Sequence, residues 1–469
     1  MGTLASLMDL ARQSLMANQA ALNVTSNNVA NQNTPGYTRQ VVSWQTRDSV
    51  TIGGLTVGGG VSVGQSGISQ RDRVLEQRVQ QQTQIQAQSA VLESAMEQVQ
   101  NIFGITSTSS SASSTQLGSS IDSFFNALSS LTANPSDTAT RQKVLSAANN
   151  LAGAFNSASN QIAQIATSLN QQVSGYVQAV NSLTSTIASL NQQIASTSPD
   201  SDAGILEDQR QLAIAQLSQY IGLNQISTEG NGITLTTSNG AVLVSGARSY
   251  ALGTAQVSGT THILDGSSGQ DITQDVVGGA LGGSLEARDQ QLTSFQASLD
   301  NLAYAIGRQV NQVNSQGLDG NGNPGQALFQ LPASASGAAG LIQLATNNSQ
   351  AIATAAIGEG STGNGNALLL AGLATAAIIS GQTASGSFGN FMGQIGNAAA
   401  DAKADNTVQQ ATLSQLTTQR NALSGVSLDE EAANLTNYQR AYEAAAKIFS
   451  IVDQMMATAL NLGVPTSVS

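Results

Sequence analysis

Apolar residues recur every seven positions near the start of the chain, with companions at Leu4 and Ala11. This spacing predicts one helix with a narrow apolar seam, which needs a partner helix to cover it. The four residues of this seam are Met8, Leu15, Leu22 and Val29.

The predicted first helix has a defined end within the stretch NNVANQNTPGYTRQ, residues 27–40. Pro35 disfavours the helical conformation at Thr34, and Pro35-Gly36 supplies the fixed negative φ and then the positive φ of a type II turn. We therefore expect the chain to form a corner here, built from Asn31, Thr34, Pro35, Gly36 and Tyr37.

The C-terminal region has the clearest helical pattern. Ser427-Leu428-Asp429-Glu430 matches a capping box, with Ser at the N-cap and Glu three residues later. Beyond the box an apolar seam continues at heptad spacing through Leu435, Tyr438, Tyr442, Ala445, Phe449, Val452, Met456 and Ala459. If the two terminal helices pair, everything between them is an insertion into one elongated molecule.

Helical spacing also dominates the interior of the chain. A seam runs from Leu75 to Phe103, and a Ser-rich break follows from Thr106 to Thr115. The strongest seam, from Ile162 to Ile194, predicts a rod of about 50 Å. Further helices are expected from near Ile121, antiparallel to the rod over residues 205–222, from Leu285 to Val313, and through Val408, Leu416 and Leu423. A Gly-, Ala- and Ser-rich region of weak periodicity fills residues 331–395.

Two regions have β character. Residues 50–70 are β-branched and punctuated by glycine, which predicts short strands or an extended arm. Apolar and polar residues alternate over residues 223–277, and Asn239-Gly240 lies between two runs rich in Val, Leu and Thr, which predicts a hairpin. The fold class is therefore mainly α with a small β domain.

Composition excludes several functions. The net charge of −12 argues against binding a nucleic acid. Cysteine is absent, so disulfides and thiolate chemistry are excluded. The start of the chain has no basic residue before Arg12, so it lacks the pattern of a secretory signal. The longest mostly apolar uncharged run, Ala367 to Ile379, has 13 residues, so we expect no membrane helix, which needs about 20.

Candidate chemistry is sparse. His262 is the sole histidine and has no recognisable nucleophile elbow near it. DGNGNPG, residues 319–325, opens like a calcium loop but has Pro324 where that loop needs glycine. GEGSTG, residues 358–363, matches a nucleotide-binding pattern without the preceding strand, and a loop before a helix capped at Asn366 accounts for it. We predict no catalytic, cofactor or metal site and therefore no enzyme.

Several motifs carry a resemblance to a known family. The stretch at residues 27–40 is similar to the N-terminal signature of the axial proteins of the bacterial flagellum, which are the rod, hook and hook-associated proteins. Its ending in Tyr37-Thr38-Arg39-Gln40 most resembles the hook-associated junction proteins. Further similar stretches are ILEDQRQLAIAQLS at 205–218, GGALGGSLEARDQQL at 278–292, SQGLDGNGNPG at 315–325 and SGVSLDEEAANLTNYQRAYEAAAKIFSIVDQMMATALNLG at 424–463.

The resemblance implies a structural role. It implies that residues 1–40 and 427–469 pair as an inner coiled-coil domain, that 41–222 and 283–426 form a helical bundle with an arm and loops, and that 223–282 form a small outer β-rich domain. It also implies a homo-oligomeric ring at the distal end of the hook, joining hook to filament.

The partners implied by the resemblance are the hook protein, the second hook–filament junction protein and a cytoplasmic export chaperone that binds the C-terminal region. The resemblance also implies an extracellular location in the flagellum, reached through the flagellar type III apparatus without a cleaved signal peptide. Two alternatives remain open: another axial protein of the hook or distal rod, and a secreted adhesin-like binding module.

Overall fold

The computed structural model describes residues 2–52, 55–104, 116–196, 204–227 and 232–461. The predicted Ser-rich break at 106–115 lies outside them. The α-helices are α1 Gly2–Asn31, α2 Arg73–Ile102, α3 Gln116–Leu131, α4 Thr138–Ser196, α5 Gly204–Tyr220, α6 Gly279–Glu286, α7 Thr293–Ser315, α8 Ala338–Leu341, α9 Gly365–Gly372, α10 Ala384–Ser424 and α11 Leu428–Asn461. Short helical segments are η2 Thr273–Asp275, the π-helix η3 Ala287–Leu292 and η4 Ser349–Ala351.

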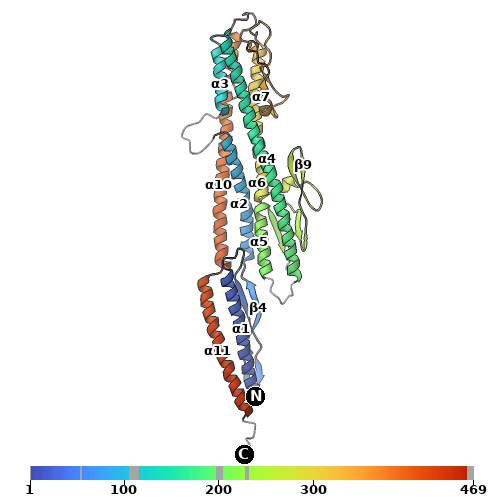
Figure 1. Cartoon of the computed structure of the whole chain (residues 1–469), viewed down its shortest axis with the longest axis vertical. Helices are drawn as coiled ribbons and strands as arrows, with labels where there is room; N and C mark the ends of the chain where they lie inside the picture. The colour runs from blue at the N-terminus through green and yellow to red at the C-terminus, as the bar shows by residue number, and fades with distance from the viewer. Residues whose placement is uncertain (1, 53–54, 105–115, 197–203, 228–231, 462–469) are drawn as a thin grey trace, which may run out of the picture.

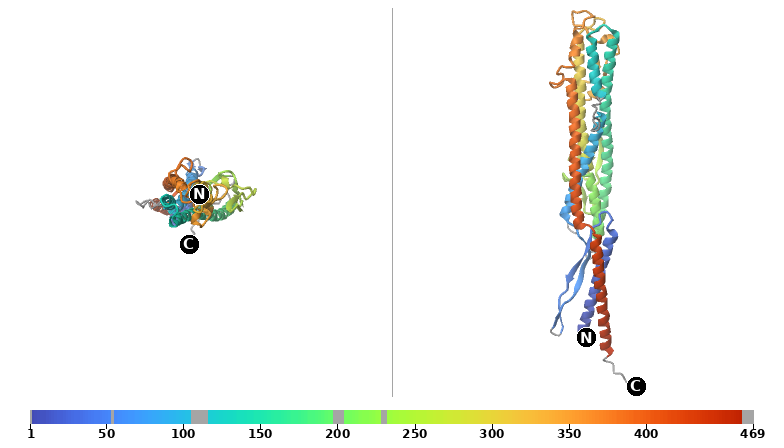
Figure 2. Two further views of the ribbon diagram at one scale, coloured as in Figure 1. Left: turned by 90° about the horizontal axis from the view of Figure 1, so that it is seen from above. Right: turned by 90° about the vertical axis from the view of Figure 1, so that its left-hand side faces the viewer.

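The two ends of the chain pack against each other, as predicted. α1 and α11 run side by side in opposite directions and form the narrow lower part of an elongated molecule (Figure 1), so that the start of α1 and the end of α11 lie at the same end. α11 begins at Leu428, directly after the predicted cap Ser427. Figure 2 shows that the remaining long helices form a body that continues this axis. The predicted fold class is therefore confirmed.

The predicted turn ends the first helix. The Tyr37 N–H donates to the Thr34 carbonyl at 3.1 Å, and Gly36 has φ +80°, as a type II turn requires. The chain then enters the predicted arm, in which β1 Gln40–Thr46 pairs antiparallel with β4 Val61–Ser69. β2 Val50–Ile52 and β3 Leu55–Val57 form a second small hairpin. A two-stranded ribbon is marginal alone, and β1 and β4 lie against α1.

α4, with 59 residues, is the spine of the body and carries the predicted long seam. Its seam contributes to two apolar cores. Up to Leu169 the seam belongs to the core that also contains residues of α3, α7 and α10, and from Val173 onward it belongs to the core that contains residues of α5 and a β-sheet. The predicted return helix is α5, which lies along α4 with the Tyr176 and Tyr220 rings 5.7 Å apart.

The β region lies on the flank of α4 (Figure 1). The strands are β5 Leu223–Ser227, β6 Ile233–Thr237, β7 Val242–Ser245, β8 Arg248–Ser249, β9 Gly253–Val257 and β10 Thr260–Leu264. β5 to β8 form one antiparallel sheet in chain order, and β9 pairs with β10. The predicted Asn239-Gly240 turn joins β6 to β7, with Gly240 at φ +97°.

The Gly-, Ala- and Ser-rich region folds over the end of the body farthest from the termini. It contains α8, η4, α9 and the short strand β12 Gln343–Leu344, which pairs with β11 Phe329–Gln330 directly before the region. Arg141, 1% exposed, holds these loops: its guanidinium donates to the Ile352 carbonyl and the Thr354 hydroxyl, each at 2.7 Å, and to the Pro135 carbonyl at 2.6 Å. Ala338, Ile342 and Leu370 of this region are also buried in the first apolar core. Its order therefore comes from irregularly spaced apolar residues together with buried polar contacts, and apolar periodicity reveals neither.

Candidate functional site

The predicted seam residues lie in the α1–α11 pair but are only partly covered. Met8, Leu15, Leu22 and Val29 are half-buried in the single chain. The most buried apolar positions of α1 are small: Ala11, Ala17 and Ala21. On α11, Val452 and Ala445 are buried, Leu435, Tyr438, Phe449 and Met456 are half-buried, and Tyr442 is 36% exposed.

A second apolar stripe on α11 remains open to solvent. Ile448, Ile451 and Met455 are 51%, 50% and 53% exposed, and the spacings of three and four residues place them on one helix face. Ala441 and Ala444 extend the stripe toward the body and are also exposed. We call these five residues the outer stripe. It is distinct from the predicted seam.

The corner residues are fixed by a hydrogen-bond network centred on Asn28, which is 1% exposed. Asn28 Oδ1 accepts from the Tyr37 hydroxyl at 2.8 Å and from the Gln40 N–H at 3.0 Å, and its Nδ2 donates to the Gln40 carbonyl at 2.9 Å. The Thr34 hydroxyl donates to Asn31 Oδ1 at 3.2 Å. The structure thus joins Asn31, Thr34 and Tyr37 to the end of α1, as their proximity in sequence suggested.

Burial raises the pKa of Tyr37 to about 12, and the negative charges of Asp208 and Glu431 add to the effect. Gly36 lies against α5, where an added Cβ would be 3.1 Å from Cβ of Leu212. The corner therefore contacts both the terminal helices and the body.

Arg39 connects the corner to the start of α11. Its Nε is 2.7 Å from Glu431 Oε1, its Nη1 is 2.9 Å from Glu430 Oε2, and its N–H donates to the Ser424 carbonyl at 3.0 Å. The Glu431 side chain is only 2% exposed, whereas Glu430 is mostly exposed. Glu430, predicted as part of the capping box, thus forms an ion pair with Arg39.

Asp208 on α5 makes the matching connection to the body. It is buried and accepts hydrogen bonds from the Thr38 N–H at 3.2 Å, from the Ser69 hydroxyl at 3.3 Å and from Arg71. Burial raises the pKa of Asp208, against the opposing effect of the Arg71 charge and of these hydrogen bonds. Arg71 also donates to the Thr38 hydroxyl at 3.1 Å.

The predicted site residues did not include Asn28, Arg39, Arg71, Asp208 or Glu431. A signal for four of them was present, because Asn28, Arg39, Asp208 and Glu431 lie inside the stretches that carry the family resemblance. Charged residues make up only 9% of the chain, so each charge within such a stretch is informative. Which charges pair could not be read from the chain, since Arg39 and Glu431 are 392 residues apart.

Comparison with known proteins bears on this arrangement of terminal helices and body. The helical-domain model of the flagellar hook-associated protein FlgK matches residues 96–329, a basal body rod protein model matches 8–38, and the C-terminal model of the basal body rod FlgEFG proteins matches 419–462. The chain belongs to the flagellar hook-associated protein 1 family. The two terminal matches are to rod proteins, so the helical domain is the part that distinguishes this family from other axial proteins.

Relatives align along nearly the whole chain. The flagellar hook-associated protein 1 of Escherichia coli (strain K12) is 26% identical over 98% of this chain and all of the relative. That of Bacillus subtilis (strain 168) is 28% identical over 97% of each. The solved flagellar hook junction protein FlgK from Burkholderia pseudomallei has a TM-score of 0.67 at 21% identity and covers 74% of this chain and all of that chain, which supports the fold.

Family membership settles two predictions. The predicted resemblance to hook-associated proteins is confirmed. Members of this family are structural flagellar proteins, so the prediction that the chain is not an enzyme is also confirmed. Within the described part of the chain, no helix is both long and apolar enough to cross a membrane.

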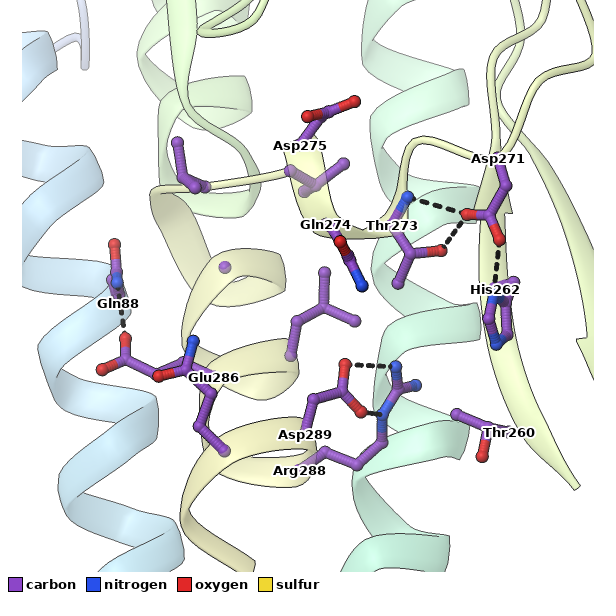
Figure 3. A pocket seen from close by; sticks show the side chains of 15 residues that line it. Gln88, Thr260, His262, Asp271, Thr273, Gln274, Asp275, Glu286, Arg288 and Asp289 are labelled. Carbon is purple, nitrogen blue, oxygen red and sulfur yellow. Dashed lines mark hydrogen bonds and ion pairs between the residues drawn. The ribbon is translucent and has the colours of Figure 1, made fainter. Parts of the chain in front are cut away.

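A cavity of about 850 Å³ lies between the β9–β10 hairpin and the α6–η3 segment and contains the sole histidine. Figure 3 shows that His262 pairs with Asp271, that Arg288 pairs with Asp289 and that Glu286 accepts a hydrogen bond from Gln88. His262 Nδ1 is 2.5 Å from Asp271 Oδ2, and Arg288 Nε is 2.7 Å from Asp289 Oδ1. Hydrogen bonds from Thr273 and His262 lower the pKa of Asp271 to about 2. In the described residues no group of three or more His, Asp or Glu is arranged to hold a metal ion.

The two loop motifs have structural roles. Asp319 accepts from the N–H groups of Asn321 and Asn323, each at 2.8 Å, and so holds its own turn. Glu359 accepts from the N–H groups of Ala356 at 3.0 Å and Gly365 at 2.9 Å and closes the GEGSTG loop. The expected cap at Asn366 is wrong, because α9 begins at Gly365 with Asn364 as its N-cap. The buried Asn366 side chain instead donates to the Ala353 carbonyl at 2.7 Å.

Proposed function

We propose that the chain is a structural subunit that polymerises into a ring at the distal end of the flagellar hook and joins the hook to the filament. Membership of the hook-associated protein 1 family supports this role. The proposed ring has a closed symmetry, in which each weak contact is repeated at every interface. The low content of charged residues, 9%, reduces repulsion between closely packed copies.

The observation that carries the proposal is the incomplete burial of the α1–α11 pair. Among the described residues, neither apolar core of the body includes a residue of α1 or α11. The buried apolar side chains of the pair are mostly alanine, which contribute little apolar area. A helix pair with so small a core is marginal alone, and the exposed outer stripe offers further surface to bury.

We infer that the two faces of α11 make different contacts. The predicted seam residues, among them Phe449 and Met456, hold α11 to α1 within the chain, and the Tyr438 ring lies 6.3 Å from that of Trp44 in β1. The outer stripe contacts a neighbouring copy in the ring. The predicted division into residues 1–40 with 427–469, 41–222 with 283–426, and 223–282 is part of this proposal, and the separate packing of the α1–α11 pair supports it.

The remaining partners belong to the same proposal. They are the hook protein, the second hook–filament junction protein and a cytoplasmic export chaperone that covers the C-terminal region before assembly. An exposed apolar stripe on α11 is a surface that a chaperone would cover. We further propose extracellular location after export through the flagellar type III apparatus, without a cleaved signal peptide.

Electron microscopy of purified hooks that lack junction proteins tests the proposal. The hooks are incubated with the full-length chain, with the double variant Ile448→Asp/Ile451→Asp and with the control Val408→Asp. Val408 is 59% exposed on α10, so its substitution introduces one aspartate at an exposed apolar position of the body. We expect added density at the distal hook tip with the full-length chain and the control, and bare tips with the double variant.

Two results would contradict the proposal. Bare tips with the folded full-length chain would remove the junction role. Normal tip density with the double variant would leave the junction role in place but show that the outer stripe does not form the contact between copies. Circular dichroism of each variant establishes that its helices are intact.

A further inference from the structure

The corner after α1 and the two chain crossings into and out of the body meet in one polar cluster. The corner contributes Thr38 and Arg39, the crossing from β4 into α2 contributes Arg71, and the crossing from α10 into α11 leads to Glu431. Asp208 joins this cluster from α5 in the body. We call these five residues the corner clamp.

The body side of the corner clamp is rigid. Asp208 lies on α5, whose Ala213, Ile214 and Leu217 are buried in the second apolar core. The position of the Asp208 carboxylate is therefore set by the packing of the body. From there it binds both Thr38 in the corner and Arg71 in the crossing from β4 into α2.

The other side of the corner clamp reaches the terminal helices. The neighbour of Thr38, Arg39, pairs with Glu431 in the first turn of α11. The neighbour on the other side, Tyr37, donates to Asn28 of α1. Three consecutive residues, Tyr37, Thr38 and Arg39, thus bind α1, α5 and α11 respectively. A rotation of the helix pair against the body would therefore lengthen the hydrogen bonds that these residues make.

The structure assigns a role to the corner clamp: it sets the angle between the α1–α11 pair and the body. Asp208 is its positioning residue. No apolar core of the described residues spans this boundary. Apolar packing is non-directional, whereas hydrogen bonds weaken steeply when they are misaligned. The polar contacts therefore select one orientation.

The consequence for assembly rests on the proposed function. If copies form a ring, each must present its helix pair at the same angle. A clamp that sets this angle in the free chain reduces the ordering required on association, which is preorganisation. The clamp itself is a property of the single chain and is tested without hooks.

Electron–electron distance measurements on spin-labelled chain test the assignment. The natural chain has no cysteine, so introduced pairs are the only thiols. One pair, Asn23→Cys on α1 with Ser185→Cys on α4, reports the angle between the helix pair and the body. The other, Ser185→Cys with Gln410→Cys on α10, reports the body alone. All three positions are exposed.

Each labelled pair is measured in the otherwise natural chain, in Asp208→Asn, in Arg39→Gln and in the control Asp289→Asn. Asp289 also pairs with an arginine, but inside the body and away from the corner. We expect Asp208→Asn and Arg39→Gln to broaden or shift the Asn23–Ser185 distance distribution. Neither should change the Ser185–Gln410 distribution, and Asp289→Asn should change neither pair.

An unchanged Asn23–Ser185 distribution in both clamp variants would overturn the assignment. So would a change in the Ser185–Gln410 distribution of equal size, because Asp208 would then support the whole fold rather than the angle. Arg39→Gln keeps the test decisive if Asp208→Asn does not fold. Hook-tip binding by the unlabelled natural chain decides the proposed function separately.

Discussion

The Tyr37 hydroxyl donates to Asn28 Oδ1 at 2.8 Å, which closes the type II turn onto the end of α1. The same Oδ1 accepts from the N–H of Gln40, and Nδ2 of Asn28 donates to the Gln40 carbonyl. One buried amide side chain thus joins the helix, the turn and the first strand of the arm. The stretch at residues 27–40 is polar because backbone N–H and carbonyl groups there lack the hydrogen-bond partners that a continuous helix would provide. Polar side chains of the stretch take the place of those partners.

Tyr37 should ionise at a higher pH than an ordinary tyrosine. Burial, together with the negative charges of Asp208 and Glu431 nearby, raises its pKa from 10.0 to about 12. The folded chain favours the neutral hydroxyl, so this contribution to stability is full below pH 10 and is lost as the pH rises from about 10 to about 12. Spectrophotometric titration of tyrosinate in the natural chain and in Tyr37→Phe measures the difference. A difference that titrates near pH 10 would contradict the buried hydrogen bond.

Asn28→Ala should loosen the corner while leaving the body folded. The substitution removes three hydrogen bonds and leaves the Gln40 N–H and carbonyl without these partners, at a cost of roughly 3 kcal/mol. Hydrogen exchange of α1 and β1 should accelerate, with little change in α4. Asn23→Ala on the exposed face of the same helix is the matched control and should shift stability by less than about 0.5 kcal/mol. Equal effects of the two substitutions would argue against the network.

Arg141→Met should destabilise the far end of the body. The guanidinium is buried and donates to the carbonyls of Pro135 and Ile352 and to Thr354, so an apolar replacement leaves these acceptors unsatisfied. We expect a loss of roughly 3 kcal/mol or more in the free energy of unfolding, measured by denaturant titration. Lys143→Met, at an exposed position two residues later, is the control and should have little effect. A similar loss from both would mean that charge, not these contacts, is responsible.

Periodicity explains which parts of the fold were predictable. The seam from Ile162 to Ile194 predicted α4 because one buried face imposes one spacing over many turns. The turn at Pro35-Gly36 was predictable because its backbone geometry is local. The partners of Arg39 and Asp208 were not, since the chain brings them together from 392 and 170 residues away. The outer stripe was not predicted from the sequence, because the apolar seam alone was enough to indicate that α11 is a helix.

Gly279→Ala and Gly175→Ala should have opposite effects on stability. Gly279 has φ +64° where the chain enters α6, and a Cβ there would overlap the backbone of Tyr220 and Ile221 at the end of α5. Both the left-handed backbone and the overlap are unfavourable for alanine, so we expect a loss of about 3 kcal/mol or more. Gly175 lies within α4 with open space around its Cα, so alanine should add about 1 kcal/mol through helix propensity. Denaturant unfolding followed by circular dichroism measures both. A stable Gly279→Ala would show that α5 and α6 do not approach as closely as described, and an unstable Gly175→Ala would show that this face of α4 is covered.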